Sequence, residues 1–420
     1  MTTTAADRRP SSSRRPLAGW VEATKHAIDR PLTSYYLLLG ATTLLLTIGL
    51  MEVLSASSVD AYTHHNGNSY YWFERQLTWV LIALPAAFLA SRMPHRALRW
   101  FSWPALLVAT VLLALTQTSL GIAVNGNQNW LALGPLVIQP AEVAKLALIL
   151  WCADVYARKD NVLGDWRHTL IPVLPVSATI VGLVLVGGDL GTAMVLMTIL
   201  LGILWVVGAP MRLFVGSLTT VAVLALYLAT TNKERLTRLT NFVNPFHDYQ
   251  GAGWQAAHSI LGIASGGIFG KGISASQQKW GALPEAHTDF IFAVLGEELG
   301  LIGTLLVLVL FLTIAYAGIR VALRTKEPFV RYMAAGITIW ITAQMIINIG
   351  MVLALLPVIG LPLPLVSYGG SSLLPELVAM GLLMSFARNE PGAKAALRAR
   401  RRRRAAAGVT AGGGTAGRGR

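Results

Sequence analysis

The sequence predicts an all-α polytopic membrane protein with about ten transmembrane helices. Of its 420 residues, 54% are hydrophobic and only 13% are charged, whereas soluble domains carry about 25% charged residues. The hydrophobic residues form runs of about 20 residues, the length that a helix needs to cross a bilayer. Lys and Arg gather in alternate connecting segments, which is typical of membrane proteins.

Ten apolar runs are long enough to cross a membrane. They lie at residues 34–57, 75–93, 100–118, 140–157, 168–187, 189–208, 211–230, 298–321, 330–356 and 371–388. Loops 58–74, 119–139 and 357–370 contain no Lys or Arg, whereas the loops that alternate with them are basic. Because basic loops stay in the cytoplasm, both tails are predicted to be cytoplasmic. Segment 231–288 becomes a large extracellular loop despite its Lys and Arg, since long loops follow this rule weakly.

The two tails are polar and carry much of the net charge of +14. Residues 1–30 lack the apolar core of a signal peptide, and we interpret residues 1–33 as a mostly disordered cytoplasmic tail. Residues 389–420 are rich in Arg, Ala and Gly, and we interpret them as a second disordered tail. This charge suits an anionic membrane face or a partner, or it only fixes the topology. No nucleic-acid partner is predicted.

The stretch Leu283–Phe292 collects three ionisable side chains at the edge of an apolar run. Glu285, His287 and Asp289 can all exchange protons, and such groups are costly beside a membrane span unless they have a function. One interpretation is a catalytic or substrate-binding cluster. The alternative is a helix start, with Thr288 as the N-cap and Asp289 favoured by the helix dipole.

The run from Phe290 to Leu323 is too long for one plain span, and Glu297 and Glu298 interrupt it. We therefore expect residues 289–296 to be interfacial or buried against the bundle. The membrane-spanning part of the helix is expected to lie beyond them.

A second polar group lies at the start of the run at 140–157. Glu142 and Lys145 are three residues apart, so they share one helix face, and charges inside a membrane helix should face protein or a water-filled cavity. The alternative is a Glu favoured by the helix dipole and a Lys that extends outward to the interface. Trp130, in the preceding loop, is either an interfacial anchor or a substrate contact.

A third group lies between residues 357 and 372. Three prolines within eight residues exclude a helix there, yet the segment is apolar, so it should be buried or line a cavity. Ser367 and the amides of Gly369 and Gly370 would suit an anionic group.

Three other features predict less. The Gly-rich segment Ser265–Gly272 lacks the spacing of an ATP-binding loop, because Gly272 stands where Ser or Thr belongs. Asp189 begins an apolar run and is predicted to cap a helix. Cys152 is the one cysteine, so no disulfide forms within the chain. No His or Cys spacing indicates a metal site.

Several of these motifs together resemble the SEDS family (shape, elongation, division and sporulation). The matching segments are Gln139–Lys145, Asp189–Thr192, Ser265–Gly272, Leu283–Phe292 with Gly296–Gly300, and Leu365–Ser372. The resemblance extends over about residues 35–388 and is closest to the division-type members, with the elongation-type members as the near alternative. One departure is Asn129, which stands before Trp130 where family members often have Arg. Another is Pro375-Glu376.

The resemblance implies a ten-helix bundle in the bacterial plasma membrane, at the division septum. It implies a peptidoglycan glycosyltransferase that polymerises lipid II, a disaccharide-pentapeptide on a polyprenyl pyrophosphate, with inversion and release of undecaprenyl pyrophosphate. It also implies a class B penicillin-binding protein as the transpeptidase partner, together with other membrane proteins of the division machinery.

The resemblance also assigns residues. Asp289 matches the essential Asp of the family and is expected to be the general base, or alternatively the ligand of a divalent cation such as Mg²⁺ or Mn²⁺. Glu142 and Lys145 match its charged pair, and Lys145 is expected to face the pyrophosphate. Substrate contacts are expected from His287, Glu285, Lys271, Lys279, Trp130, Ser367, Gly369 and Gly370.

Two other classes of function remain open from the sequence. A polytopic bundle with intramembrane charges suits a lipid II flippase. However, no clear inverted repeat is present, and the charged groups gather at one face rather than at the midplane. A non-catalytic division scaffold would suit the tails but would leave the acidic cluster without a role.

Overall fold

The computed structural model describes residues 32–124, 127–134, 136–230, 236–237, 242, 244–251, 253–390 and 392–393. Both tails that were predicted to be disordered lie outside these residues, apart from a few positions at their inner ends. Parts of the loop 231–288 lie outside them as well.

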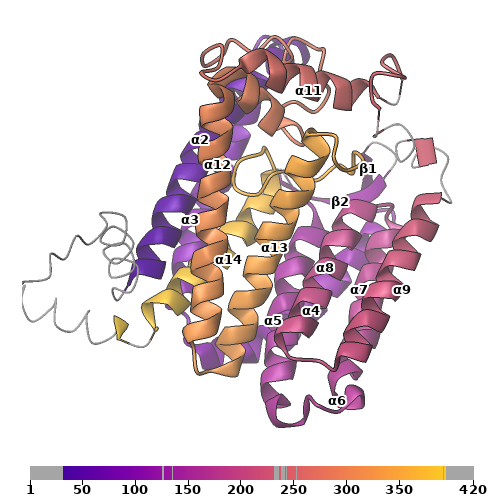
Figure 1. The fold of residues 1–420 in the computed structure, drawn as a ribbon, viewed down its shortest axis with the longest axis vertical. Helices are drawn as coiled ribbons and strands as arrows, with labels where there is room; N and C mark the ends of the chain where they lie inside the picture. The colour runs from indigo at the N-terminus through magenta and orange to yellow at the C-terminus, as the bar shows by residue number, and fades with distance from the viewer. Residues whose placement is uncertain are drawn as a thin grey trace, which may run out of the picture.

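Long helices run side by side along a single bundle (Figure 1). They are α2 (Thr33–His64), α3 (Tyr71–Arg92), α4 (His95–Thr116), α5 (Pro140–Arg158), α7 (Val173–Val186), α8 (Leu190–Val206), α9 (Met211–Thr230), α12 (Ile291–Arg324), α13 (Pro328–Val352) and α14 (Leu373–Arg388). Each of the ten predicted apolar runs coincides with one of them. Helices suit this environment because they satisfy every backbone polar group internally.

Among the described residues, seven helices are long and apolar enough to cross a membrane, one of them formed by α6 (Trp166–Leu170) together with α7. The helices that complete the predicted ten are α5, α8 and α9. The first carries four ionisable side chains, and the other two have shorter apolar stretches. The chain is therefore a multi-pass membrane protein, and the count of ten spans stays a prediction.

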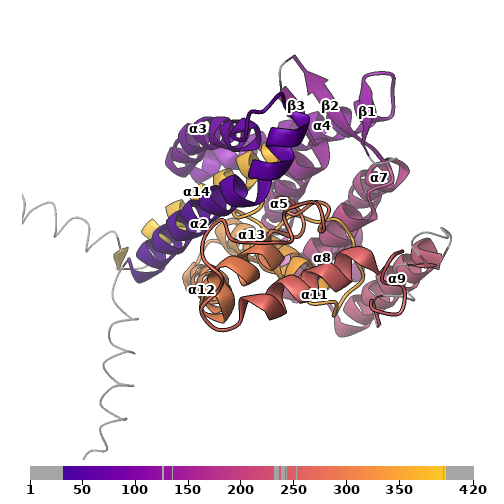
Figure 2. The same ribbon diagram turned by 90° about the horizontal axis from the view of Figure 1, so that it is seen from above.

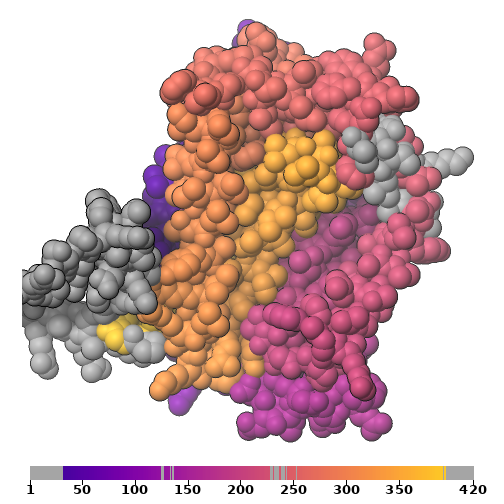
Figure 3. Space-filling view, in the orientation of Figure 1, coloured from indigo at the N-terminus to yellow at the C-terminus, as the bar shows by residue number. Residues whose placement is uncertain are grey.

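The core lies around α13, which packs against α5, α8 and α12. Trp340 and Ile337 of α13 are fully buried there, as is Trp151 of α5. A second contact surface joins α14 to α3 and α2. In Figure 3, the yellow-orange surface of α13 shows between α12 and the side formed by α8 and α9.

The two ends of the bundle differ in charge. One end carries α11 (Trp254–Gly266), and we call it the α11 end; the other carries α6, and we call it the α6 end (Figure 1). The loops between α3 and α4, α5 and α7, and α12 and α13 lie at the α6 end and are basic. The predicted loops 58–74, 119–139 and 357–370, which have no Lys or Arg, lie at the α11 end, as does the segment between α11 and α12, which carries Lys271 and Lys279. The predicted alternation of charge is thus real, and the assignment of the α6 end to the cytoplasm stays a prediction.

The predicted loop 119–139 contains a small antiparallel sheet that the sequence analysis missed. Its strands are β1 (Gly121–Val124), β2 (Asn127–Leu133) and β3 (Leu136–Ile138), in the order β1-β2-β3. Ile122 pairs with Trp130, and Leu131 pairs with Ile138. The sheet lies at the rim of the α11 end (Figure 2). The sheet leads directly into α5 and so positions Gln139 and Glu142 at the start of this helix.

The helix α12 begins at Ile291 and bends at Gly300, whose φ of 66° and ψ of −162° are not helical. The segment Ile291–Glu298 before the bend is buried against the bundle, as expected. The helix itself starts earlier than the predicted span at 298–321, because both parts form one kinked helix.

Candidate active site

Asp289 lies at the α11 end, two residues before α12. Its main-chain oxygen accepts a hydrogen bond from Asn348 Nδ2 of α13 at 2.8 Å, and the same amide donates to Leu361 O at 2.6 Å. Its carboxylate lies beside Gly360, where a Cβ would come within 3.4 Å of Oδ2. Asn348 therefore fixes the main chain at Asp289, and the carboxylate lies next to the loop after α13.

The environment of Asp289 favours its protonated form. Burial, together with the nearby carboxylates of Glu285 and Asp189, raises the pKa of Asp289 to about 7. A carboxylate with a pKa near neutrality is suited to accept a proton during a reaction. Burial lowers the pKa of His287 and outweighs the carboxylates of Glu285 and Asp60, which act to raise it. This ring is therefore neutral at pH 7.

The capping alternative for this stretch is wrong. The residue before α12 is Phe290, and no side chain caps the helix there. Thr288 Oγ1 instead donates to Glu285 Oε2 at 2.6 Å. Asp289 lies outside the helix, so its presence has to be explained by something other than helix initiation.

His287 belongs to an aromatic cluster with Trp72 of α3 and Tyr368. Its ring stacks on Trp72 with a centroid distance of 5.3 Å and lies 5.8 Å from Tyr368. Burial raises the pKa of Tyr368 to about 12, so this phenol stays protonated. Tyr368 N donates to His287 O at 2.9 Å, which joins the loop after α13 to the segment that carries Asp289, whereas Glu285 is exposed.

Glu142 and Lys145 form the predicted ion pair. Lys145 Nζ lies 2.9 Å from Glu142 Oε2, and the side chains are 0% and 2% exposed. The ammonium group also donates to Gln344 Oε1 at 2.9 Å and lies 5.2 Å from the Trp340 ring centre. Gln344 in turn donates to Pro362 O at 3.0 Å. The alternative of a Lys that extends outward is therefore wrong, and its contact with pyrophosphate stays a prediction.

Glu376, in the Pro375-Glu376 pair that departs from the family pattern, has a structural role. It lies in the first turn of α14 and is 2% exposed. Its Oε2 accepts the amide of Leu365 at 2.9 Å, which fixes a residue with a φ of 63°. It also interacts electrostatically with Glu142 and Lys145. Glu376 thus connects the buried pair to the loop that holds Asp289.

The loop after α13 is irregular and buried, as predicted. Ser367 Oγ accepts from Leu363 N at 2.8 Å, and Ser371 Oγ accepts from Gln139 N at 2.9 Å. Gly370 has a φ of 50°, and a Cβ there would come within 3.5 Å of the Trp79 ring nitrogen. These groups join the loop to α3 and to the start of α5. Anion binding by Ser367, Gly369 and Gly370 stays a prediction.

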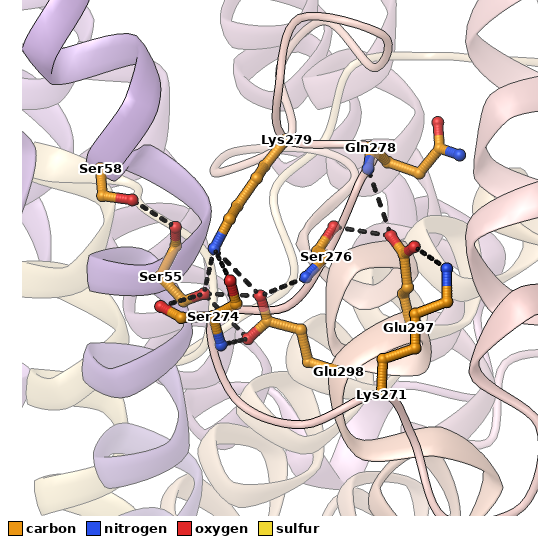
Figure 4. A network of polar contacts seen from close by, with 9 residues as sticks. All are labelled: Ser55, Ser58, Lys271, Ser274, Ser276, Gln278, Lys279, Glu297 and Glu298. Carbon is orange, nitrogen blue, oxygen red and sulfur yellow. Dashed lines mark hydrogen bonds and ion pairs between the residues drawn. The ribbon is translucent and has the colours of Figure 1, made fainter.

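Lys271 and Lys279, which were expected to contact the substrate, each form an ion pair with a glutamate of α12. Lys271 Nζ lies 2.7 Å from Glu297 Oε1, and Lys279 Nζ lies 3.4 Å from Glu298 Oε1 (Figure 4). Long-range ion pairs of this kind cannot be read from spacing. The two lysines fasten the loop to α12, and their contact with substrate stays a prediction.

The carboxylate of Glu298 holds further groups. It accepts Ser55 Oγ of α2 at 2.6 Å and Ser274 N at 2.8 Å, while Ser276 Oγ donates to Glu297 Oε2 at 2.6 Å. Neither glutamate was predicted as a site residue. Their position inside an apolar run, where charge is costly, was the available signal.

The Gly-rich segment Ser265–Gly272 holds the bend of α12. Leu301 N donates to Gly267 O at 2.9 Å, and Gly272 N donates to Glu298 O at 3.0 Å. A Cβ on Gly270 would lie 2.1 Å from Glu298 O, so only Gly fits. The segment thus satisfies backbone groups that the bend leaves without helical partners, and the absence of ATP binding stays a prediction.

Asp189 caps α8, as predicted, and does more. Its carboxylate accepts Thr192 N at 2.8 Å. It also accepts Gln139 Nε2 at 3.0 Å and Asn129 Nδ2 at 3.3 Å from other elements. Trp130 is half-buried in β2 next to Asn129, and the choice between membrane anchor and substrate contact stays open.

These features define a multi-pass membrane protein with a group of buried acids at one end of a helical bundle. The family model described as "Cell cycle protein", which covers FtsW, RodA and SpoVE, matches residues 36–391. The chain belongs to this family, which confirms the SEDS resemblance.

Relatives and solved structures support membership of the same family. The Probable peptidoglycan glycosyltransferase FtsW of Mycobacterium tuberculosis is 40% identical over 375 residues, which is 89% of this chain and 71% of the relative. The Stage V sporulation protein E of Bacillus subtilis is 36% identical over 357 residues, 84% and 96% of the two chains. A chain of a peptidoglycan synthase complex has a TM-score of 0.68 at 26% identity, covering 84% and 97%. RodA of Thermus thermophilus has a TM-score of 0.61 at 28% identity, covering 84% and 96%.

Proposed function

We propose that this protein is a peptidoglycan glycosyltransferase that polymerises lipid II into glycan strands during septal wall synthesis. Relatives named as probable peptidoglycan glycosyltransferases, at 40% identity over most of the chain, support the activity. The observation that carries the chemistry is Asp289, whose carboxyl group has a pKa raised to about 7 and whose main-chain oxygen is bound by Asn348. The FtsW names of these relatives favour the division role over elongation.

The reaction joins the 4-hydroxyl of an acceptor GlcNAc to the anomeric carbon of a donor MurNAc. The new C–O bond forms as the bond to pyrophosphate breaks, so an α linkage becomes β. The proton of the attacking hydroxyl goes to Asp289, and the electron pair of the broken bond leaves with undecaprenyl pyrophosphate. A base placed at the incoming hydroxyl typically contributes about 10²–10⁴-fold in rate.

Charge on the leaving pyrophosphate has to be stabilised. Lys145, which belongs to the pair that matches the family's charged pair, is the candidate cation, and it is bound by Glu142 and Gln344. Among the residues that the structure describes, no three His, Cys, Asp or Glu side chains are grouped to hold a metal ion. The donor set thus does not fit a cation held by protein alone, and we derive no step through one. The expected Mg²⁺ or Mn²⁺ stays a prediction that polymerisation with and without chelator tests.

The experiment is polymerisation of labelled lipid II by purified protein carrying Asp289→Asn. The amide keeps the size of the side chain but cannot take the proton, so polymer formation should fall at least about a hundredfold. Glu285→Gln is the control, because its exposed carboxylate is paired locally with Thr288, and it should cost less. Near-normal polymerisation by a folded Asp289→Asn protein would falsify the assignment.

The same assay separates the other classes of function. Transfer of lipid II across the bilayer without polymer would indicate a flippase, and neither activity would indicate a scaffold or a missing partner. The solved complex described as coordinating polymerization and crosslinking supports a crosslinking partner. We infer that this partner is a class B penicillin-binding protein and that further division proteins join it at the septum.

A further inference from the structure

Two further rings extend the aromatic cluster across the α11 end. The Tyr71 ring stacks on His65 with a centroid distance of 3.6 Å, and these rings contact Trp72 edge-on at 5.0 and 5.3 Å. Trp72 in turn contacts His287 and Tyr368. We call these five rings the aromatic surface. Each of the five residues is half-buried, so each keeps an accessible part.

The aromatic surface joins segments that are far apart in sequence. Its rings come from the loop after α2, the start of α3, the segment before α12 and the loop after α13. Aromatic residues that only mark the membrane interface form a belt of separate anchors at headgroup level. Here the rings contact one another across four segments instead, which is the arrangement of a binding surface.

Polar groups flank the rings. The Asp60 side chain is 40% exposed, and its carboxylate accepts Trp72 Nε1 at 2.9 Å. Arg75, which is half-buried, donates to Tyr71 Oη at 3.1 Å. A carboxylate and a guanidinium group each present two polar atoms side by side, which matches two neighbouring hydroxyl groups of a sugar. The negative face of an aromatic ring suits the C–H groups on the face of a pyranose, so the combination favours a saccharide.

The aromatic surface reaches the candidate active site. His287 lies two residues before Asp289, so their Cα atoms are at most about 8 Å apart. Asp289 is itself half-buried. The hydrogen bond from Tyr368 N to His287 O holds the loop after α13 against the same segment. A saccharide whose reacting unit lies at Asp289 therefore has its neighbouring unit within reach of these rings.

We propose that the aromatic surface binds the glycan strand next to the sugar that reacts at Asp289. The rings stack on the faces of the sugars, and Asp60 and Arg75 bind hydroxyl groups at their edges. This inference rests on the proposed function, because the strand is the product of that reaction. The surface retains the strand between successive additions of lipid II, so it controls the length of the product more than the rate of transfer.

Binding is tested with a soluble tetrasaccharide of alternating GlcNAc and MurNAc that carries no peptide. Full-length protein with Asp289→Asn is titrated with this probe, and binding is followed by saturation-transfer NMR. In that background, Trp72→Leu removes the central ring and should weaken binding about tenfold, whereas Trp72→Phe keeps a ring and should retain most of the affinity. Trp166→Leu is the matched control, because Trp166 lies at the α6 end and is 54% exposed, and it should leave binding unchanged.

The length of the strands gives a second readout, with Asp289 intact and labelled lipid II as the substrate. Faster release of the strand lowers the number of additions in each binding event, so Trp72→Leu should make strands several-fold shorter. The initial rate of lipid II consumption should change little, whereas misfolding would lower rate and length together. Tyr71→Leu is the second variant if Trp72→Leu does not fold, because the described ring contacts of Tyr71 lie within the aromatic surface.

The outcomes separate this inference from the proposed function. Tetrasaccharide binding that depends on Trp72, without any polymer from the unmodified protein, would contradict the proposed function but support the aromatic surface. Unchanged binding and unchanged strand length in Trp72→Leu and Tyr71→Leu would overturn the aromatic surface. Equal losses in Trp166→Leu, or binding of the free pentapeptide in place of the tetrasaccharide, would overturn it as well.

Discussion

Removing Lys145 should destabilise the protein more than removing most surface charges, and the structure gives the magnitude. The ammonium group has no exposed surface, and the Glu142 carboxylate 2.9 Å away is 2% exposed. Loss of one member of a buried ion pair typically costs about 3–5 kcal/mol, because the other charge stays buried without compensation. We therefore expect Lys145→Met to lower the free energy of unfolding by about that amount.

Glu142→Gln should cost less than Lys145→Met. In the first variant Lys145 keeps its hydrogen bond to Gln344 and its position over Trp340. In the second variant Glu142 Oε2 loses its one described contact. The double variant should cost less than the sum of the two, with a coupling of about 1–3 kcal/mol.

The assay is thermal unfolding in detergent micelles, with lipid II polymerisation measured on the same preparations. His64→Gln is the control, because it breaks an exposed pair with Asp60 and should change the midpoint little. Unchanged midpoints for both single variants, or strictly additive costs, would refute a coupled buried pair. A loss of polymerisation larger than the loss of folded protein would add a role for Lys145 at the leaving group.

Three further predictions follow from charge and position. Polymerisation should rise with pH through about 7 as Asp289 loses its proton. Because the pKa of this carboxyl is raised on folding, the unmodified protein should lose stability as the pH rises from about 4 through 7. The Asp289→Asn protein should lose less stability over this range, which melting temperatures measured at several pH values can check. Glu298→Gln should loosen the loop 271–279, because Lys279 loses its carboxylate partner and Ser55 and Ser274 N lose a charged acceptor. Hydrogen exchange of that loop should become faster, with Glu285→Gln as the exposed control. Unchanged exchange would contradict this prediction. Cysteines at Gly67 or Gly360 should react with an impermeant reagent from outside the cell, whereas cysteines at Ser13 or Thr410 should not; labelling of Gly360 only from the cytoplasm would contradict the topology.

The helices were predictable from the sequence because a bilayer imposes a simple rule on them. A backbone inside lipid has to satisfy its own hydrogen bonds, so each apolar run of sufficient length becomes a helix whatever its neighbours are. The Glu142–Lys145 pair was predictable for a similar reason, since a spacing of three residues on a helix already places two side chains on one face.

The pairs that hold the loop to α12 were not predictable, because their partners are far apart in sequence. Lys271 and Glu297 are brought together only after α12 bends at Gly300 and the Gly-rich segment packs against the bend. The sheet of β1 to β3 was missed although Asn125-Gly126 and Gly134-Pro135 are turn signals. Its strands are short, and they lay in a region interpreted only as a loop between spans.

The distribution of polar groups along the bundle favours chemistry at one membrane face over transport across it. At the α11 end lie Asp289, the aromatic cluster and Asp189 with its partners Gln139 and Thr192. At the α6 end, Asp154 is fully buried and binds Arg99 and Arg158. Between these ends the described core is closely filled by apolar side chains, including Trp151 and Ile337. A carrier needs a polar site that can open to either end, whereas a lipid-linked sugar can reach Asp289 from one leaflet while its polyprenyl chain remains in the bilayer.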